Sequence, residues 1–518
     1  MRSLLADEGF AAPTLAQSMA IPPILAGRHV LLIAATGMGK TESAVLPVFH
    51  RHLARIRTGE IGTGQIATDE HGADEKPARG ISIVYVTPLR ALNRDLLGRL
   101  EAWGERLGIR VAVRHGDTTK AERARQSRDP PTMLITTPET VQILLTGRNL
   151  RRHLAAVRTV IVDEIHELAE DERGSQLAVA LERLERVAGP YQRVGLSATV
   201  GDPGTVAEFL GGLGREVQIV RVPVAKRLQI RVESPSSTQA DEELGQRIYA
   251  RADATAHLRR ALGLVDTHKA TLLFVNTREV AEVLAARSRM IGVDPPLAVH
   301  HGSLSRDSRI WAEQEFKSGR ARGLICTSSM ELGIDIGAAD LVVQYGSPRQ
   351  VARLVQRAGR SGHRSDLVSN GVVIATDPDD IAEATVIARR AMAEELEIFA
   401  LPLRPLDVLA NQLVAMAVEG VRDLTTAFDT IRRARPFKQL RREQFDAVAT
   451  QLRELRLLFV DQSHYKQGAA GLRYFFENLS MIPDQVSYTV YNVASGGKVA
   501  QLDEDFVANF VEPGAVFI

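Results

Sequence analysis

One segment, residues 34–41 with the sequence Ala-Ala-Thr-Gly-Met-Gly-Lys-Thr, constrains the fold of this chain more than any other. It follows the apolar run 29–33 and precedes residues 42–50, whose apolar side chains recur at helical spacing. A glycine-rich turn between a buried strand and a helix lets backbone N–H groups and the helix dipole converge on phosphate oxygens. The pattern A-x4-G-K-T therefore predicts a phosphate-binding loop. The alternative, an ordinary glycine turn, does not account for the lysine, threonine and helix that follow in order.

The residues of this loop have predicted parts in binding ATP and Mg²⁺. Gly37 and Gly39 let the backbone fold inward, Lys40 reaches the outer phosphates, and Thr41 is a ligand of the metal ion. Gln17, just upstream, carries an amide donor and acceptor that match one edge of adenine. A lone Gln at a helix start is usually a solvated or capping residue, and only its place just upstream of the loop favours adenine. The predicted ATP-binding residues of this region are Gln17, Thr36, Gly37, Met38, Gly39, Lys40 and Thr41.

Composition limits the class of protein but does not identify a binding partner. A chain of 518 residues suggests three to four domains of about 150 residues each. The net charge is only +1, so any nucleic-acid site must be local rather than a property of the whole surface. The single cysteine, Cys326, excludes an internal disulfide and a thiolate metal site. With no apolar run near ~18 residues and no signal-peptide pattern at its start, we expect a cytoplasmic protein without a membrane partner.

Strand patterns alternate with helical patterns along the first 200 positions. The predicted strands after the first one are 81–87, 111–114, 132–136, 160–162 and 194–196. This alternation predicts a parallel, doubly wound sheet, whose ligands bind at the carboxyl ends of the strands. Polar turns follow those ends, and we expect them to contact a phosphodiester backbone, although each alone could be a helix cap. The predicted nucleic-acid contacts here are Pro88, Arg90 and Thr137. Residues 57–80 form a polar insertion to which no chemistry is assigned.

An acidic pair, Asp163 and Glu164, directly follows the strand pattern 160–162. Beside a phosphate loop, this pair predicts that Asp163 holds Mg²⁺, while Glu164 orients and deprotonates the attacking water. Two capping acids are the alternative, and they explain neither the strand nor the nearby histidine. The residues predicted to couple this site to a nucleic-acid surface are His166, Ser197 and Thr199.

The second half of the chain repeats the alternation after a polar stretch, residues 221–260, that shows no sustained strand pattern. Its predicted strands are 271–275, 298–299 and 324–326. It has no second phosphate loop, so we expect it to supply groups to a nucleotide held by the first half. In the block 356–364, Arg360 is predicted to meet the charge that builds on the γ-phosphate, with Gln356 as a second catalytic residue. A basic helix end is the alternative, but it leaves the Q-x-x-G-R spacing unexplained.

Taken in order, these blocks resemble the serial motifs of superfamily-two helicases. The correspondence is the Q motif at 9–17, motif I at 34–41, motif Ia at 87–92, a later contact at 137–139, motif II at 163–166, motif III at 197–199, motif IV at 276–278, motif V at 327–335 and motif VI at 356–364. Asp-Glu-Ile-His, the segments 329–337 and 344–348, and the Gly-His-Arg ending of motif VI resemble the Lhr (large helicase-related) group. The usual last arginine of motif VI falls on His363, with Arg364 one place later. Which of these two side chains joins Arg360 at the γ-phosphate stays open.

The resemblance implies a fold class and further site residues. The fold is α/β, with two tandem RecA-like doubly wound parallel-sheet domains, followed by a winged-helix domain and the start of a β-rich domain. The expected ranges are 1–215, 216–390, 391–465 and 466–518, the last with a hairpin turn at 495–497 and a truncated end. The resemblance adds Gly333 and Asp335 to the ATP site, and Asn276 and Thr327 to the nucleic-acid surface.

A basic stretch, residues 432–442, lies among the predicted winged-helix helices 406–418, 427–431 and 444–455. It holds six basic residues and no acid. It could track the phosphates of a strand, or it could be a solvated face whose arginine stems pack on the winged helix. The strand-tracking hypothesis assigns nucleic-acid binding to Arg432, Arg433 and Arg435.

The leading functional hypothesis is a nucleic-acid-dependent ATPase that uses ATP and Mg²⁺ and moves along single-stranded DNA. The Lhr resemblance implies 3′-to-5′ polarity, unwinding of DNA or RNA–DNA duplexes, and a role in DNA repair. An RNA helicase or RNA–protein remodeller is a second hypothesis, because nothing in the motifs excludes a 2′-hydroxyl. A third is a nucleic-acid clamp that uses ATP only as a switch.

Overall fold

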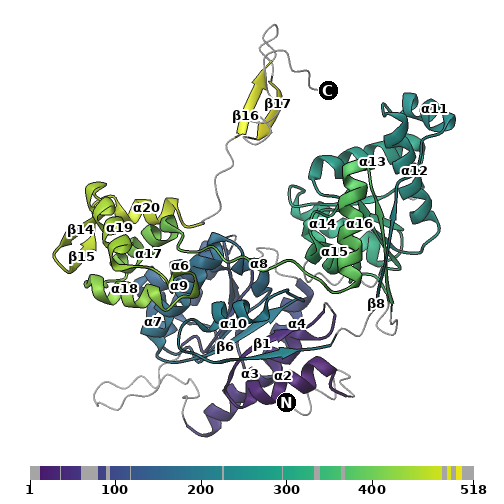
Figure 1. The fold of residues 1–518 in the computed structure, drawn as a ribbon. Coiled ribbons are helices and arrows are strands. Elements are labelled where there is room, and N and C mark those ends of the chain that lie inside the picture. Colours follow the sequence, from purple (N-terminus) through teal and green to yellow (C-terminus); the bar gives the residue numbers. More distant parts are fainter. Residues whose placement is uncertain are drawn as a thin grey trace.

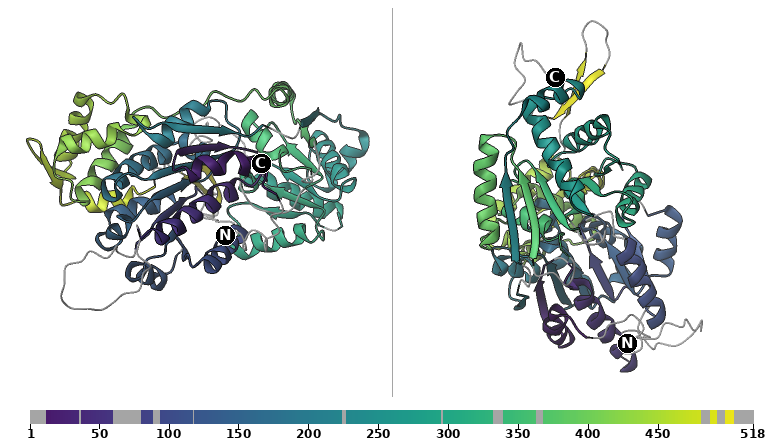
Figure 2. Two further views of the ribbon diagram at one scale, coloured as in Figure 1. Left: turned by 90° about the horizontal axis from the view of Figure 1, so that it is seen from below. Right: turned by 90° about the vertical axis from the view of Figure 1, so that its right-hand side faces the viewer.

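The computed structural model of the chain describes residues 12–35, 37–59, 80–88, 94–116, 118–223, 227–294, 296–331, 339–362, 368–480, 487–491 and 498–503. It contains two α/β domains, a mainly helical third domain and a two-stranded hairpin (Figure 1). The first α/β domain lies between the second α/β domain and the helical domain, as both Figure 1 and the left view of Figure 2 show. The predicted fold class is confirmed for the two parallel-sheet domains and the winged-helix domain.

The first domain is built on a seven-stranded sheet in the order β3-β4-β2-β5-β6-β1-β7, with every neighbouring pair parallel. The strands are β1 (His29–Ile33), β2 (Ile83–Val86), β3 (Val111–Arg114), β4 (Met133–Thr136), β5 (Thr159–Val162), β6 (Gln192–Ser197) and β7 (Val217–Arg221). The central strands are buried along their whole length, as expected for a parallel sheet covered on both faces. Because β7 pairs with β1, the first sheet continues past residue 215, where the sequence pattern placed the end of this domain.

Helices cover both faces of the first sheet. They are α2 (Leu15–Leu25), α3 (Lys40–Arg57), α4 (Arg94–Leu107), α5 (Lys120–Arg128), α6 (Pro138–Thr146), α7 (Arg148–Leu154), α8 (Ile165–Ala169), α9 (Glu172–Ala188) and α10 (Pro203–Gly211). One apolar cluster joins the sheet to α2, α3 and α4, and another joins its opposite face to α6, α8, α9 and α10. The carboxyl ends of the strands therefore stay at an open edge between the two layers.

The second domain has a six-stranded parallel sheet in the order β10-β11-β9-β12-β13-β8. Its strands are β8 (Arg227–Glu233), β9 (Thr271–Phe274), β10 (Ala298–His300), β11 (Gly323–Cys326), β12 (Leu341–Tyr345) and β13 (Val368–Ile374). Its helices are α11 (Gln239–Arg247), α12 (Ala252–Asp266), α13 (Arg278–Ile291), α14 (Arg306–Lys317), the 3₁₀ turn η1 (Ser328–Met330), α15 (Val351–Ala358) and α16 (Pro378–Met392). The prediction that residues 221–260 hold no strand was wrong for β8. This edge strand buries only Ile230, so its sequence carries no apolar run.

The third domain contains α17 (Leu406–Val418), α18 (Leu424–Arg432), the 3₁₀ turn η2 (Arg435–Phe437), α19 (Arg442–Glu454), the hairpin β14 (Leu458–Asp461) with β15 (His464–Gln467), and α20 (Gly471–Glu477). Three helices with a small hairpin form the predicted winged-helix arrangement. Residues 466–518, expected as the start of a β-rich domain, include the helix α20, whose Phe475 is fully buried in the core. The antiparallel pair β16 (Ser487–Tyr491) and β17 (Lys498–Asp503) follows. The predicted hairpin turn at 495–497 and the insertion from 60 to 79 lie outside the described residues.

The third domain shares its core with the first. A single cluster of buried side chains includes Leu177 and Leu181 of α9 together with Leu413 and Met416 of α17. The buried guanidinium of Arg183 lies within this contact. Within the described residues, no helix is long and apolar enough to cross a membrane.

Candidate functional site

The predicted phosphate loop joins β1 to α3 at the carboxyl edge of the first sheet. Gly37 and Gly39 have positive φ angles of 81° and 79°, a region that residues with side chains rarely enter. The first N–H groups of α3 point toward the loop, as at the start of any helix. The N-cap of α3 is Gly39, which has no side chain to accept a bond from them. Thr14 holds the loop in place, since its hydroxyl donates to the carbonyl of Met38 at 3.1 Å. This geometry suits a phosphate group.

Gln17 lies beside the loop but also caps a helix. Its amide oxygen accepts from the Thr14 N–H at 3.0 Å and completes a capping box at the start of α2. Its amide nitrogen would lie 3.2 Å from a Cβ atom placed on Gly39. The structure therefore shows the capping alternative directly, and contact with adenine stays a prediction.

The acidic pair lies beside the phosphate loop, as its sequence position predicted. Glu164 Oε2 is 4.0 Å from the ammonium nitrogen of Lys40, which also donates to the Ala34 carbonyl at 3.2 Å. Glu164 lies at the turn into α8 and has a left-handed φ of 47°. This backbone angle is uncommon for a residue with a side chain, and it sets the direction of the carboxylate. Burial would raise its pKa, but Lys40, His166 and Arg360 hold the pKa of Glu164 below the ordinary value. The carboxylate is therefore ionised at neutral pH and able to accept a proton.

Asp163 is held by a tyrosine that the sequence patterns did not single out. The Tyr85 hydroxyl, on the neighbouring strand β2, donates to Asp163 Oδ2 at 2.6 Å and also interacts with the side chain of Thr41. Burial and the nearby Glu164 charge raise the pKa of Asp163 to about 6. A polar residue in an otherwise apolar buried strand was the available signal for Tyr85. It brings together the two residues predicted to hold Mg²⁺.

His166 connects the first domain to the second. Its Nε2 atom lies 3.0 Å from the side-chain nitrogen of Gln356 on α15, and its Nδ1 atom lies 3.4 Å from the backbone nitrogen of Ala198. Burial lowers the pKa of His166 to about 4, so the ring is neutral at physiological pH. Ser197, which is fully buried, donates to the Ala198 carbonyl at 2.8 Å, and Thr199 is half-buried two positions later. The structure thus brings together three predicted site residues, Gln356, His166 and Ser197, on two domains.

Arg360 follows the last residues of α15 and faces the acidic pair. Its guanidinium donates to the carbonyl of Glu331, and its positive charge is one of those that lower the pKa of Glu164. Neighbouring Arg357, which sequence reasoning passed over, is fully buried and donates to Glu331 Oε1 at 2.6 Å. Its guanidinium also lies 5.2 Å from the centre of the Phe274 ring. A charge that is buried and paired in this way fixes the end of the helix that precedes Arg360.

The residues present fit a magnesium nucleotide. Within the described part of the chain, no group of three His, Cys, Asp or Glu side chains could hold a metal ion. Proteins commonly bind Mg²⁺ through one or two side chains, while phosphates and waters complete the octahedron. The buried Asp163 carboxylate and the Thr41 hydroxyl, both next to Tyr85, would be those protein ligands. Lys40 and the start of α3 would hold the phosphates.

Three family models match the chain and together cover most of it. The DEAD/DEAH box helicase model matches residues 14–206, the helicase conserved C-terminal domain matches 253–365, and the winged-helix domain of large helicase-related proteins matches 389–518. The chain is 36% identical to the ATP-dependent helicase Lhr-Core of Methanocaldococcus jannaschii, over 97% of this chain and 59% of that protein. The chain belongs to the Lhr family of helicases. The predicted resemblance is confirmed.

Two further Lhr proteins are similar to this chain. The Lhr helicase/probable uracil glycosylase of Mycolicibacterium smegmatis is 35% identical, over 96% of this chain and 35% of that protein. The structure of Mycobacterium smegmatis helicase Lhr bound to ssDNA and AMP-PNP superposes with a TM-score of 0.77 at 35% identity, over 94% of this chain and 63% of that one. The chain spans about three fifths of the length of the M. jannaschii protein.

The other predicted nucleic-acid contacts of this Lhr chain have varied surroundings. Thr137 is buried as the N-cap of α6, and the Pro88 carbonyl accepts from Arg173 at 3.2 Å. Asn276 is exposed, and its amide donates to the Ser347 carbonyl at 2.8 Å. Thr327 is the N-cap residue of η1 and is half-buried. The predicted residues Thr36, Arg90, Gly333, Asp335, His363 and Arg364 lie outside the described residues.

The basic stretch is engaged with the protein itself. Arg433 pairs with Glu182 at 3.0 Å and Glu185 at 2.9 Å on α9, and Arg435 pairs with Glu208 on α10. The Arg432 guanidinium lies 5.3 Å from the ring centre of Phe428. These contacts favour the alternative in which the arginine stems pack on the protein, and the assignment of Arg432, Arg433 and Arg435 to nucleic acid stays a prediction. The acids that pair with them come from another domain, so they are not visible in a local count of charges.

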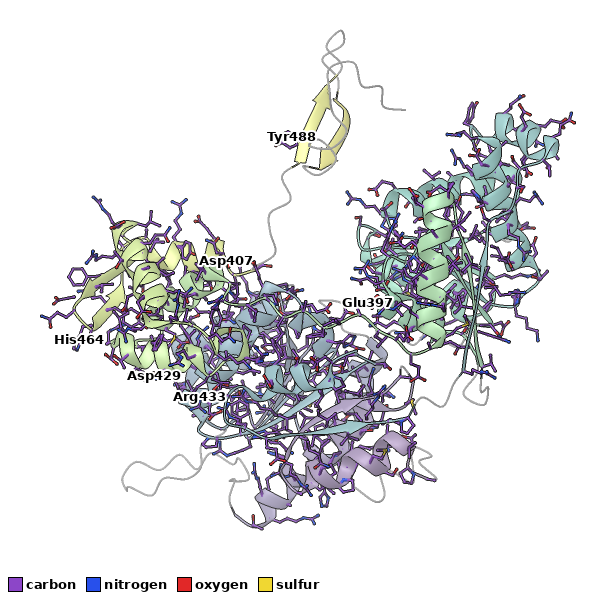
Figure 3. The ribbon with its side chains drawn as sticks, viewed as in Figure 1. Glu397, Asp407, Asp429, Arg433, His464 and Tyr488 are labelled. Atoms are coloured by element: carbon purple, nitrogen blue, oxygen red, sulfur yellow. The ribbon has the colours of Figure 1, made fainter. Side chains whose placement is uncertain are left out.

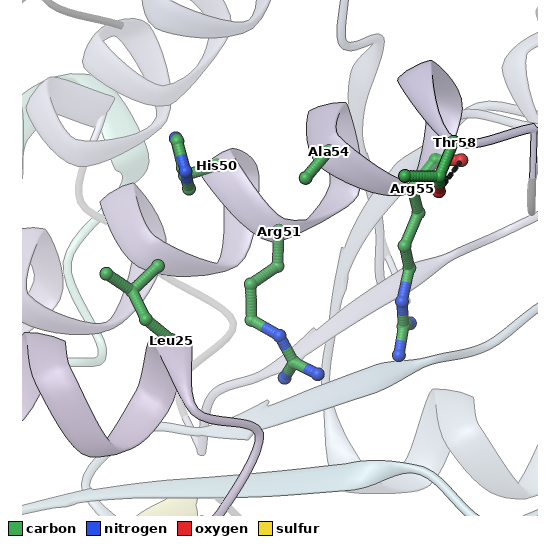
Figure 4. Close-up of a pocket in the computed structure, with 6 residues that line it drawn as sticks. All are labelled: Leu25, His50, Arg51, Ala54, Arg55 and Thr58. Atoms are coloured by element: carbon green, nitrogen blue, oxygen red, sulfur yellow. Dashed lines mark hydrogen bonds between the residues drawn. The ribbon is translucent and has the colours of Figure 1, made fainter.

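A surface cavity of this Lhr chain lies away from these residues (Figure 4). It is lined by Leu25, at the end of α2, and by residues from the last half of α3 and its C-cap: His50, Arg51, Ala54, Arg55 and Thr58. Arg51, which points into it, bonds with Gln192 and the Ile24 carbonyl. The 18-residue helix α3 is about 27 Å long and Lys40 is at its other end, so this cavity is not the nucleotide site.

Proposed function

We propose that this chain is an ATP-hydrolysing helicase that moves 3′ to 5′ along single-stranded DNA and separates DNA or RNA–DNA duplexes, in DNA repair. The observation that carries the proposal is the polar contact across the two α/β domains, where Gln356 meets His166 at 3.0 Å and Arg360 faces Glu164. The groups needed for phosphoryl transfer are complete only when both domains contribute. ATP turnover would therefore be tied to the relative position of the domains.

The residues divide the reaction between them. The loop and Lys40 bind and orient the phosphates of ATP, and bound Mg²⁺ would neutralise phosphate charge there. Glu164, ionised in this structure, takes the proton of the attacking water. Arg360 stabilises the charge on the transferred phosphoryl group, with a guanidinium that forms two parallel bonds. The roles of Gly333 and Asp335 in ATP binding belong to this proposal on the family resemblance alone.

Movement along a strand follows from the same contacts. ATP bound between the domains favours the closed arrangement, and loss of the γ-phosphate removes the ligand that joins Lys40 to Arg360. The third domain shares a core with the first, so it moves with that domain. The related M. smegmatis structure, at 35% identity, is bound to ssDNA and AMP-PNP, which supports single-stranded DNA and a nucleotide as ligands here. The buried thiol of Cys326 suits the reducing cytoplasm, where we place the protein.

The test is ATP turnover with and without single-stranded DNA, followed by unwinding of matched 3′-tailed and 5′-tailed duplexes of DNA, RNA–DNA and RNA. We expect DNA-stimulated hydrolysis and unwinding only from the 3′ tail. Glu164→Gln preserves the shape of the site but removes the base, so it should abolish turnover while leaving ATP and DNA binding largely intact. Stimulation by RNA alone would favour an RNA remodeller. Binding without turnover in the unmodified protein would favour an ATP-switched clamp.

A further inference from the structure

The helix that carries Gln356 is capped by a residue from a distant segment. The N-cap of α15, Gln350, makes no side-chain bond to the helix. Instead, the Glu397 carboxylate accepts from the N–H groups of Val351 and Ala352, the latter at 3.1 Å. A carboxylate at this position satisfies two donors and complements the helix dipole. Glu397 lies in residues 393–405, the connecting segment that joins α16 to α17.

The connecting segment also presses on the first domain. A Cβ atom placed on Gly201 would lie only 2.2 Å from the Glu397 carbonyl oxygen, so the two backbones touch and a side chain at position 201 would displace the segment. Gly201 follows closely after Ser197, the site residue at the end of β6. Figure 3 shows Glu397 where the segment passes between the first and second domains.

The far end of the connecting segment is anchored in a core that belongs to the first and third domains. Phe399, two residues after Glu397, is buried in the cluster that joins α9 to α17. Between them, Ile398 is 90% exposed and contributes little to this anchor. Glu397 is therefore fixed on one side by the core of the first and third domains, and its carboxylate reaches α15 of the second domain. The cap is thus also a connection between domains.

We propose that Glu397 is a positioning residue for hydrolysis: it seats α15 against the first domain, so that Gln356 and Arg360 reach His166 and Glu164. This inference rests on the proposed ATP hydrolysis and adds a named connection that controls domain closure. The competing explanation is that Glu397 only stabilises α15 as a helix. The two explanations differ in what a disturbance on the other side of the segment would do.

Three variants separate the explanations. Glu397→Ala removes the cap, and Gly201→Ala displaces the segment from the first domain without removing any atom of the cap. Asp377→Ala is the matched control. Asp377 caps α16 of the same domain by accepting from the Asp380 N–H at 2.9 Å. Unlike Glu397, it directly precedes the helix that it caps. Glu397→Asp keeps the charge on a shorter side chain and should restore part of the activity.

We expect Glu397→Ala and Gly201→Ala each to lower kcat for ATP at least tenfold, with ATP affinity unchanged, because the phosphate loop is untouched. Asp377→Ala should lower the unfolding temperature yet leave kcat within twofold. If Gly201→Ala has normal kcat, or if Asp377→Ala loses as much activity as Glu397→Ala, Glu397 is only a helix cap and the proposal is overturned.

A second measurement does not depend on catalysis. Cysteines introduced at the exposed residues Glu105 of α4 and Glu243 of α11 would carry a fluorescence donor and acceptor on the two domains. With AMP-PNP and single-stranded DNA, energy transfer should show domain closure in the parent protein and in Asp377→Ala, but less closure in Glu397→Ala and Gly201→Ala. Identical transfer in all four proteins overturns the positioning role. Absence of ATP turnover in the parent protein, with these differences in closure present, would contradict the proposed function alone.

Discussion

The first domain meets its two neighbours in opposite ways. Toward the third domain it shares a continuous apolar core, in which α9 packs against α17 and α18. Toward the second domain, none of the apolar clusters among the described residues includes side chains from both domains. That contact consists of polar groups, among them the 3.0 Å approach of Gln356 to His166 and the Glu397 cap.

This difference identifies the joint that moves. Separating an apolar interface exposes surface to water, at about 25 cal/mol for each Å², so the joint between the first and third domains should stay closed. Polar groups exchange their partners for water at a small net cost, so the joint between the α/β domains opens readily and needs a ligand to close it. The chemistry is located at the second joint, where closing and opening can be coupled to ATP.

The largest expected effect is at the moving joint. Arg360→Ala should lower kcat for ATP by ~10³ or more, the usual effect of removing such an arginine, without changing the unfolding temperature. Arg389→Ala, an exposed arginine of α16 in the same domain, is the matched control and should retain most activity. A rise in the Michaelis constant with kcat unchanged would make Arg360 a binding residue instead.

The next effect is at the closed joint and should appear in stability. Arg183 is buried there, where its Nε donates to Glu419 Oε1 at 3.0 Å and its Nη1 donates to Gln412 Oε1 at 2.6 Å. Arg183→Ala leaves the Glu419 carboxylate buried and unpaired, which should cost about 3–5 kcal/mol of unfolding free energy in a urea titration. The double variant Arg183→Met with Glu419→Leu removes both charges and should recover most of this loss. If the single variant is as stable as the parent, this joint does not depend on its buried ion pair.

A smaller effect concerns the basic stretch beside that joint. Because Arg433 pairs with Glu182 and Glu185, Arg432→Ala with Arg433→Ala should lower stability by about 1 kcal/mol or less. The salt dependence of single-strand binding should not change, since these charges already have protein partners. A log–log slope that falls by ~0.7 for each lost contact would instead restore the strand-tracking hypothesis. Equilibrium binding across a salt series measures it.

These two joints also show what can be predicted from one sequence. The bounds of β1 and β3 matched their apolar runs, and motif spacing predicted a common site for Lys40, Glu164 and Arg360, which the structure places near one another. The strand β8 was missed because it is an exposed edge, and α20 because its aromatic run, Tyr474 to Phe476, is too short to distinguish a helix from a strand. Tyr85, Arg357 and Glu397 act through partners from other elements. Their parts therefore depend on tertiary contacts that no local pattern contains.

The smallest expected effect is a pH dependence of the closed joint. Burial and the neighbouring carboxyl of Asp407, on α17, raise the pKa of Glu172, at the start of α9, to about 7, and Asp171 adds to the rise. A carboxyl whose pKa is raised in the folded state destabilises it progressively as pH rises from the ordinary value near 4.5 through 7, because the unfolded chain gives up its proton first.

Glu172→Gln removes that penalty, so it should be as stable as the parent at pH 4 and more stable at pH 8. Since Glu172 is only half-buried and solvent screens its charge, we expect a gain of a few tenths of a kcal/mol. Asp407→Asn should act in the same direction, because it removes the other half of the pair, and Glu443→Gln, on the exposed face of α19, is the control. Thermal unfolding of the four proteins from pH 4 to pH 8 measures the difference. A gain that is constant with pH would mean that the two carboxyl groups do not share a proton across the joint.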